Sequence, residues 1–178
     1  MTSSLDLLDA VHAALTGTTD AGALVFRPGD WPSQPNTLPQ LKLRILSESR
    51  QSIARSGAPE FITTTTIRIV GEVQARATED DLGATEAEGL LWSLKRQVEV
   101  AIVNSYPLTG LIQQIASMQS QIAFNAEGAV HLAGVQIDLA LEFYEGPESF
   151  APVASSDLTQ IHLVATAYPP AATDVPLT

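Results

Sequence analysis

The sequence predicts an α+β protein: an antiparallel or mixed β-sheet with a long β-hairpin, packed by two main α-helices on one face. Two stretches repeat apolar residues at helical spacing, and several others alternate apolar and polar residues as strands do. Their order is helix, long hairpin, helix, then two or three strands. With 178 residues, 45% of them hydrophobic and 16% charged, the chain is long and apolar enough to bury a core.

The first helix is predicted over residues 3–16. Ser3 or Ser4 can cap it by accepting a backbone N–H bond, and Asp6 lies near its first turn, where the helix dipole favours a negative charge. Gly17 ends it. The predicted buried face consists of Leu5, Leu8, Val11 and Leu15, with Leu7 and Ala14 on its border.

A loop and a long hairpin follow this helix. Residues 18–39 form the loop, because "RPGDWPSQPNTLP" contains four prolines. Residues 40–48 alternate apolar and basic side chains and are predicted to pair antiparallel with a strand of residues 61–73 across a loop at 49–59. The threonines of "FITTTTIRIVGEV" are β-branched and suit a pleated strand, in which Gly71 marks a bulge or a bend.

The second half of the chain begins with a helix at about residues 84–104. Thr85 and Glu88 have the spacing of a capping box. "LIQQIASMQSQIAF" is expected to form one or two strands, followed by a turn at Asn125–Gly128. The predicted buried stripe of the helix consists of Ala87, Leu91, Leu94, Val98, Ala101 and Ile102, flanked by Leu90 and Trp92.

The last strands and the tail complete the predicted domain. "VHLAGVQIDLALEFYE" is a strand with Val135, Ile137, Leu139, Leu141 and Phe143 facing the core. "LTQIHLVATAY" is a last short strand. Residues 1–165 are expected to form one domain, and the proline-rich tail of residues 166–178 is expected to fray or to lie on a neighbouring chain.

The charge is unevenly distributed along the chain. The net charge is −11, but residues 27–55 hold five basic and two acidic residues, a net +3, whereas the rest holds four basic and eighteen acidic residues, a net −14. An acidic protein is unsuited to general nucleic-acid binding, because phosphate contacts need a basic face. The basic segment is either a docking surface for an acidic partner or a second copy, or an ordinary solvated surface.

No residue pattern predicts catalysis or a cofactor. The chain has no cysteine, and His12, His131 and His162 lack metal-ligand spacing, so each is expected to be structural or exposed. The acids at 79–81 precede a helix, where acidic residues are favoured without a metal. The start lacks the basic region of a signal peptide, and no apolar run approaches the roughly 18 residues that span a membrane. We therefore predict no enzyme activity, no metal and no cofactor.

The order of these segments resembles the tail terminator proteins of long-tailed bacteriophages, typified by the lambda minor tail protein that caps the tail tube, with relatives in Mu-like phages. The resemblance covers roughly residues 3–165. It rests on the helix "LDLLDAVHAALTG", the Trp-containing proline-rich loop, the strands "LPQLKLRIL" and "TTTTIRIVGEVQARA", the helix "GLLWSLKRQVEVAIV" ending at "YPLTGLI", and the closing "VQIDLALEFYEG".

This resemblance implies a structural virion protein that needs no cofactor. Family members form a hexameric ring on the head-proximal end of the tail tube, stop its polymerisation and offer a surface for head or neck attachment. The implied partners are copies of the chain, the tail tube protein, and a neck or head-completion protein, with a sheath as a further candidate; DNA passes through the lumen without specific binding. By analogy, the hairpin tip and the proline-rich loop contact the tube or a neighbouring subunit, and the candidate interface residues are Arg27, Asp30, Trp31, Arg50 and Arg55.

Three other functions remain open at this stage. A neck or head–tail completion protein shares the virion setting, and an acidic lumen that repels phosphate suits both assignments. A small hydrolase could use Asp80, Asp81 or Glu86. A non-viral cytosolic binding module is the third alternative. A closed oligomer or a capped tube would favour assembly, whereas a concave pocket with convergent polar groups would favour an enzyme.

Overall fold

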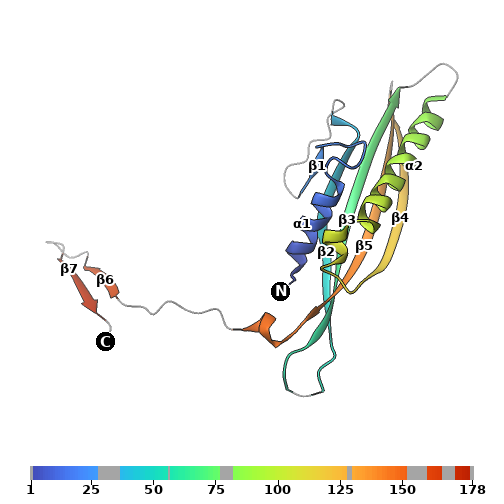
Figure 1. The fold of residues 1–178 in the computed structure, drawn as a ribbon. Helices are drawn as coiled ribbons and strands as arrows, with labels where there is room; N and C mark the ends of the chain where they lie inside the picture. Colours follow the sequence, from blue (N-terminus) through green and yellow to red (C-terminus); the bar gives the residue numbers. More distant parts are fainter. Residues whose placement is uncertain are drawn as a thin grey trace.

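The computed structural model describes residues 2–27, 37–55, 57–76, 82–127, 130–151, 160–165 and 171–176. A five-stranded mixed sheet and three α-helices place the protein in the predicted α+β class (Figure 1). In chain order, the helices and strands are α1 (Ser4–Leu15), β1 (Val25–Phe26), β2 (Gln40–Ser52), β3 (Phe61–Arg76), α2 (Leu82–Val103), α3 (Tyr106–Thr109), β4 (Gln114–Glu127), β5 (Val130–Glu145), the 3₁₀ turn η2 (Pro147–Phe150), β6 (Gln160–Ala165) and β7 (Ala171–Pro176).

The five-stranded sheet has the order β1-β2-β3-β5-β4, and only the β1–β2 pair is parallel. The pairs β2–β3, β3–β5 and β5–β4 are antiparallel. Register shifts place one extra residue at Leu46 in β2 and one at Ala116 in β4. The bulge predicted at Gly71 is wrong, because its register runs unbroken into both neighbouring strands.

Gly71 has a packing role instead. A Cβ atom added there would lie 3.1 Å from a methyl group of Val135 and 3.3 Å from methyl groups of Leu41 and Leu94. These distances are at or below ordinary van der Waals contact. The missing side chain therefore lets Leu94 of α2 lie close to the middle of the sheet.

One face of the sheet is covered by α1 and α2, which lie side by side in front of it (Figure 1). Every second residue of β3 from Thr63 to Ala75 is buried, and the residues between them are half-buried. In β5, every second residue from Ala133 to Phe143 is likewise buried, so the alternation predicted for both strands is confirmed. The largest fully buried side chains include Leu41, Leu43, Ile67, Ile69, Leu91, Leu94, Ile137 and Phe143.

The helices differ from the predictions at their ends. Ser3 and Asp6 form a reciprocal capping box at the start of α1, but Leu5 is 60% exposed and Leu7 is buried in its place. Because α2 begins at Leu82, Thr85 lies inside the helix and is not its cap. The predicted core positions of α2 are buried except Ala101, which packs partly buried against the core.

Three strand boundaries also differ. β2 continues to Ser52, so the connection to β3 is shorter than the predicted loop of residues 49–59. β4 includes residues 125–127, where a turn was predicted. Residues 171–176, in the tail that was expected to fray, form β7, which pairs antiparallel with β6 in a separate two-stranded sheet. None of the helices among the described residues is both long enough and apolar enough to cross a membrane.

Ile67→Asp is expected to abolish cooperative unfolding. Ile67 lies opposite Leu139 in the β3–β5 pair, and both side chains are fully buried. An unpaired carboxylate there would be far costlier than the marginal stability of a domain, which is about 5–15 kcal/mol. Thr66→Asp on the half-buried opposite face is the matched control. Circular dichroism melting curves measure both, and a native-like transition for Ile67→Asp would contradict this assignment of the core.

Two glycines of α2 are expected to respond in opposite directions to alanine. A Cβ at Gly83 would lie 2.3 Å from the carbonyl oxygen of Arg76, whereas a Cβ at Gly89 would meet no atom within 4 Å. Gly89→Ala should raise the free energy of unfolding by up to about 1 kcal/mol through helix propensity. Gly83→Ala should lower it by about 1–3 kcal/mol, because the helix must shift. Urea denaturation of both variants measures this, and equal effects would refute the close approach of α2 to β3.

Candidate assembly surfaces

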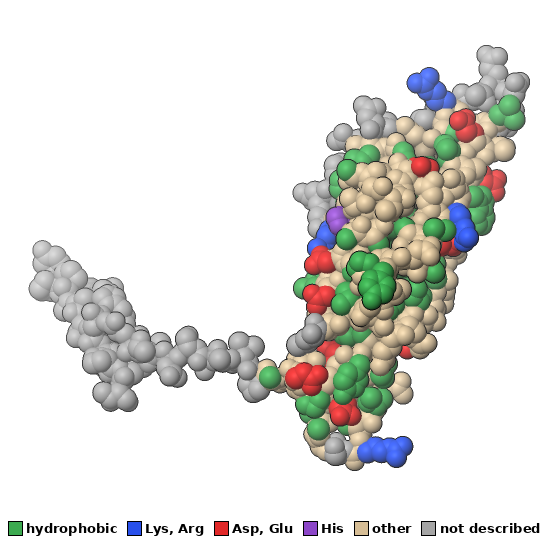
Figure 2. All heavy atoms as spheres, in the orientation of Figure 1, with side chains coloured by type: hydrophobic (Ala, Val, Ile, Leu, Met, Phe, Trp, Pro, Cys, Tyr) green, Lys and Arg blue, Asp and Glu red, His purple; other side chains and the backbone are tan. Residues whose placement is uncertain are grey.

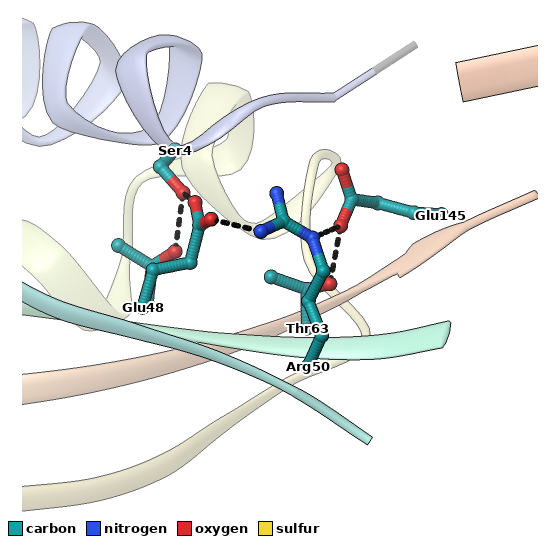
Figure 3. Close-up of polar contacts among 6 residues, drawn as sticks. Ser4, Glu48, Arg50, Thr63 and Glu145 are labelled. Carbon is teal, nitrogen blue, oxygen red and sulfur yellow. Dashed lines mark hydrogen bonds and ion pairs between the residues drawn. The ribbon is translucent and has the colours of Figure 1, made fainter. Parts of the chain in front are cut away.

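A network of buried and partly exposed polar side chains joins β2, β3 and β5 (Figure 3). Arg50 of β2 donates from Nε to Glu145 of β5 at 2.7 Å and from Nη1 to Glu48 at 2.5 Å. Thr63 of β3 donates from its hydroxyl to the same Glu145 carboxylate. The Glu145 side chain is only 7% exposed, so its charge is compensated by these donors.

The network continues from Glu48 to the first helix. Ser4, the first residue of α1, donates its hydroxyl hydrogen to Glu48, and its Oγ lies 2.6 Å from the hydroxyl oxygen of Thr65. The side chains of Ser4, Glu48 and Arg50 point toward one another beneath the start of α1 (Figure 3). The N-terminus of α1 is therefore tied to β2 and β3 by polar contacts, and β5 joins them through Arg50.

The pKa values reflect the same contacts. Burial raises the pKa of Glu145, but hydrogen bonds from Arg50 and Thr63 and the charge of Arg50 outweigh it and leave the pKa below its ordinary value of 4.5. The hydrogen bond to Glu145 raises the pKa of Arg50, so this guanidinium stays charged. No described buried side-chain nitrogen or oxygen lacks a hydrogen-bond partner, so the network is a satisfied structural element.

The five predicted interface residues do not form one surface. Arg27 forms an ion pair with Asp9 of α1, close to β1. β1 pairs with β2 at Lys42, and Arg50 lies eight residues farther along β2, about 26 Å away at the usual rise of a strand. Asp30 and Trp31 lie outside the described residues.

Arg50 and Arg55 have different environments, although both were predicted at a basic hairpin tip. Arg50 lies within β2 and forms ion pairs with Glu48 and Glu145, so its position in a tip loop is wrong. The reason is that β2 is longer than its alternating pattern predicted. Arg55 lies in the connection between β2 and β3 and is exposed. Only Arg55 remains a tip residue that a partner could contact without disturbing the network.

An exposed apolar surface on α2 and α3, which we call the α2 surface, was not predicted. Helical spacing places four apolar residues of α2 on the side opposite its buried stripe, and Tyr106 of α3 adds a ring that is 86% exposed. Figure 2 shows hydrophobic side chains gathered over the region of α3. The α2 surface consists of Leu82, Trp92, Val100, Val103 and Tyr106.

An apolar groove adjoins the α2 surface between α1 and α2. Its volume is about 720 Å³. Small side chains line it, with Ala10, Ala13 and Ala14 from α1 and Ala101 from α2, together with the larger side chains of Arg96 and Tyr106. Exposed apolar side chains beside an apolar groove are typical of a surface that contacts another protein.

The other face of the sheet is polar and carries an ion pair at its centre. Arg68 of β3 donates two hydrogen bonds to Asp138 of β5, at 2.7 and 2.8 Å. The hydrogen bond from Arg68 lowers the pKa of Asp138 from its ordinary value of 3.8. The described residues contain no group of three His, Cys, Asp or Glu side chains that could hold a metal ion. Asp80 and Asp81 lie outside the described residues, and Glu86 is exposed on α2.

The sequence pattern predicts only part of the polar network. The alternation of β3 placed Thr63 and Thr65 on the apolar face, where a buried hydroxyl needs a partner. Glu48 and Arg50 reach the same face because the extra residue at Leu46 reverses the alternation of β2. The residues of "RILSESRQS" do not indicate a bulge, so the contacts of Glu48 and Arg50 could not be predicted from the sequence.

No protein-family model and no curated protein sequence matches this chain.

Glu145→Gln is expected to lower stability at pH 7 and to reduce the acid sensitivity of the protein. Because the pKa of Glu145 is lower in the folded state than its ordinary 4.5, its ionisation stabilises the fold above about pH 4.5, and this contribution is lost as the pH falls through the folded-state pKa. Losing the charged hydrogen bonds should cost about 1–3 kcal/mol at pH 7.

Urea denaturation at pH 7 and pH 3 measures this effect. The matched control is Glu86→Gln, which changes an exposed carboxylate on α2. The stability difference between Glu145→Gln and wild type should be smaller at pH 3 than at pH 7, because the wild-type carboxylate loses its charge as the pH falls through its folded-state pKa. A difference that stays constant between the two pH values would show that the charge of Glu145 contributes nothing.

Proposed function

We propose that this chain is a structural assembly protein, a phage tail terminator that caps the head-proximal end of the tail tube as a ring. The observation that carries the assembly role is the α2 surface, with Leu82 60%, Val103 56% and Tyr106 86% exposed. Single exposed apolar residues are common, but a group on one helix side next to an apolar groove is typical of a protein contact. The choice of a tail terminator rests on the resemblance in the order of the segments.

The proposed ring uses the two layers of the fold for different contacts. The long β2–β3 hairpin, with Arg55 near its tip, projects toward the tube, and the helical layer of α1 and α2 meets the neck or a neighbouring subunit. The sheet beneath the helices provides a stiff frame, because β3 and β5 pair over sixteen residues. The strongly acidic net charge of −11 suits a lumen through which DNA slides, since acidic side chains repel phosphate.

The groove between α1 and α2 supports a second candidate, a non-viral binding module. Its alanine-rich walls and volume of about 720 Å³ suit an apolar helix or peptide of another protein. In that case the chain would act alone in the cytosol and would bind one partner without forming a ring. A neck or head–tail completion protein would use the same helical layer but would bind preformed terminator rings or heads.

Electron microscopy of the purified protein, mixed with polymerising tail-tube protein from the same genomic neighbourhood, tests the proposal. Rings at one tube end and arrested tube length are expected. Tubes that grow uncapped would exclude the terminator function. Binding to heads alone would favour the neck protein, and binding of one apolar peptide without a ring would favour the module.

Variants in the same assay test the contacts of the helical layer and of the β2–β3 hairpin separately. Trp92→Glu with Val103→Glu should abolish ring formation or neck attachment, because two carboxylates would interrupt the α2 surface. Thr64→Glu with Thr66→Glu adds the same charge on the opposite face of the sheet and is the control. Arg55→Glu tests the hairpin tip without disturbing Arg50, and unchanged capping in this variant would remove the tip from the tube contact.

A further inference from the structure

The edge strand β4 lacks most of the features that protect sheet edges from association. It is fourteen residues long, and its sequence "QIASMQSQIAFNAE" contains no proline, no lysine and no arginine; its one charge is the last residue. Its one register shift lies near the start, at Ala116. Within the described part of the chain β4 pairs with β5 alone. Exposed edges usually carry lysine, proline or bulges, and a long edge without them is a template for another strand.

The apolar layer of the core is also incomplete at this edge. Ile115, Met118 and Ile122 of β4 are only partly buried against the core, and Phe124 is 57% exposed. Their counterparts on β5 are fully buried; Leu139, for example, lies opposite Met118. A further strand beside β4 would cover these side chains as well as pair its backbone. The same edge therefore offers both hydrogen-bonding groups and apolar contacts.

The chain also contains a hairpin that belongs to no larger sheet. β6 and β7 are six residues each, pair with each other in antiparallel register and are not hydrogen-bonded to the five-stranded sheet (Figure 1). An isolated two-stranded hairpin is marginally stable at best, and three or more strands are needed for independent stability. The β6–β7 hairpin therefore needs an additional strand, which β4 can supply.

The route of the chain favours the β4 edge of a second copy over its own. After β5, the turn η2 brings Phe150 against Phe61 of β3, with the two rings 5.3 Å apart. β3 lies on the side of β5 away from β4. The chain thus turns away from its own β4 before the β6–β7 hairpin begins. The eight residues 152–159 extend over at most about 29 Å, which is the greatest distance at which the hairpin can lie from Ala151.

We propose that the β6–β7 hairpin of one chain adds to the β4 edge of a second copy and extends its sheet. Each chain has one such hairpin and one such edge, so each chain donates once and accepts once. Such a heterologous contact builds a ring when its rotation closes. This pairing is the contact between subunits in the ring of the proposed function. The pairing itself requires neither a tail tube nor a phage origin.

Two full-length variants test the two halves of the contact. Gln119→Lys with Gln121→Lys adds two charges to exposed positions of β4 and protects its edge. Leu163→Pro with Thr173→Pro removes backbone donors at paired positions of β6 and β7. Gln51→Lys, at an exposed position of β2, is the matched control. Circular dichroism confirms the fold of each, and sedimentation velocity at concentrations up to about millimolar measures the mass.

The expected result is an oligomer for the wild type and for Gln51→Lys, and a monomer for both double variants. A mixture of the two double variants should form a complex of two chains and nothing larger, because the proline variant retains an intact β4 edge and the lysine variant retains an intact hairpin. A monomeric wild type, or an oligomer that persists in the proline variant, would overturn the proposal. Symmetric pairing of two β4 edges would give that second outcome.

The sedimentation experiment and the tube assay can each refute one proposal without refuting the other. If the isolated protein associates through β4 but does not cap tubes, the contact stands and the terminator function is lost. If the protein caps tubes while the proline variant does so equally well, the function stands and this contact is wrong.

Discussion

The pairing of β3 with β5 is the constraint on which the rest of the structure depends. It runs without a register shift from Phe61↔Glu145 to Arg76↔Val130. Because side chains alternate across a strand, this register sets which residues of both strands face the helices. A slip of β3 by one residue against β5 would move Ile67 to the polar face and Arg68 into the core, while Leu139 of β5 would keep its side. The helices, the outer strands and the polar network all depend on this register.

The covered face of the sheet contains both apolar and polar contacts, at different positions along the strands. Its middle is apolar and closely packed, where Gly71 leaves room for Leu94 of α2. Toward the hairpin it becomes polar, where Glu145 accepts hydrogen bonds from Arg50 and Thr63. A carboxylate that is nearly buried is stable only with such donors. The network thus orients α1 through Ser4, while the apolar middle supplies most of the stabilisation.

Two surfaces outside this core are available for contacts with other protein chains. The outward side of α2 and the groove beside it are apolar without belonging to the core. The β4 edge ends the sheet without charges over most of its length. These two surfaces lie on different parts of the fold, one on the helical layer and one at the sheet edge. A chain that assembles in a ring and also binds a second structure needs two separate surfaces of this kind.

The sequence alone determined the α+β class, the alternation of β3 and β5 and the buried stripe of α2, because local spacing sets which side chains share a face. It did not determine the register shift at Leu46, which turns Glu48 and Arg50 toward Ser4 and Glu145. It also misplaced Leu5 and the end of β4, since burial depends on which partner lies against a residue. The tertiary structure alone decided which charges are paired, which strand forms the open edge and which side of α2 faces outward, because each depends on contacts between residues far apart in the chain.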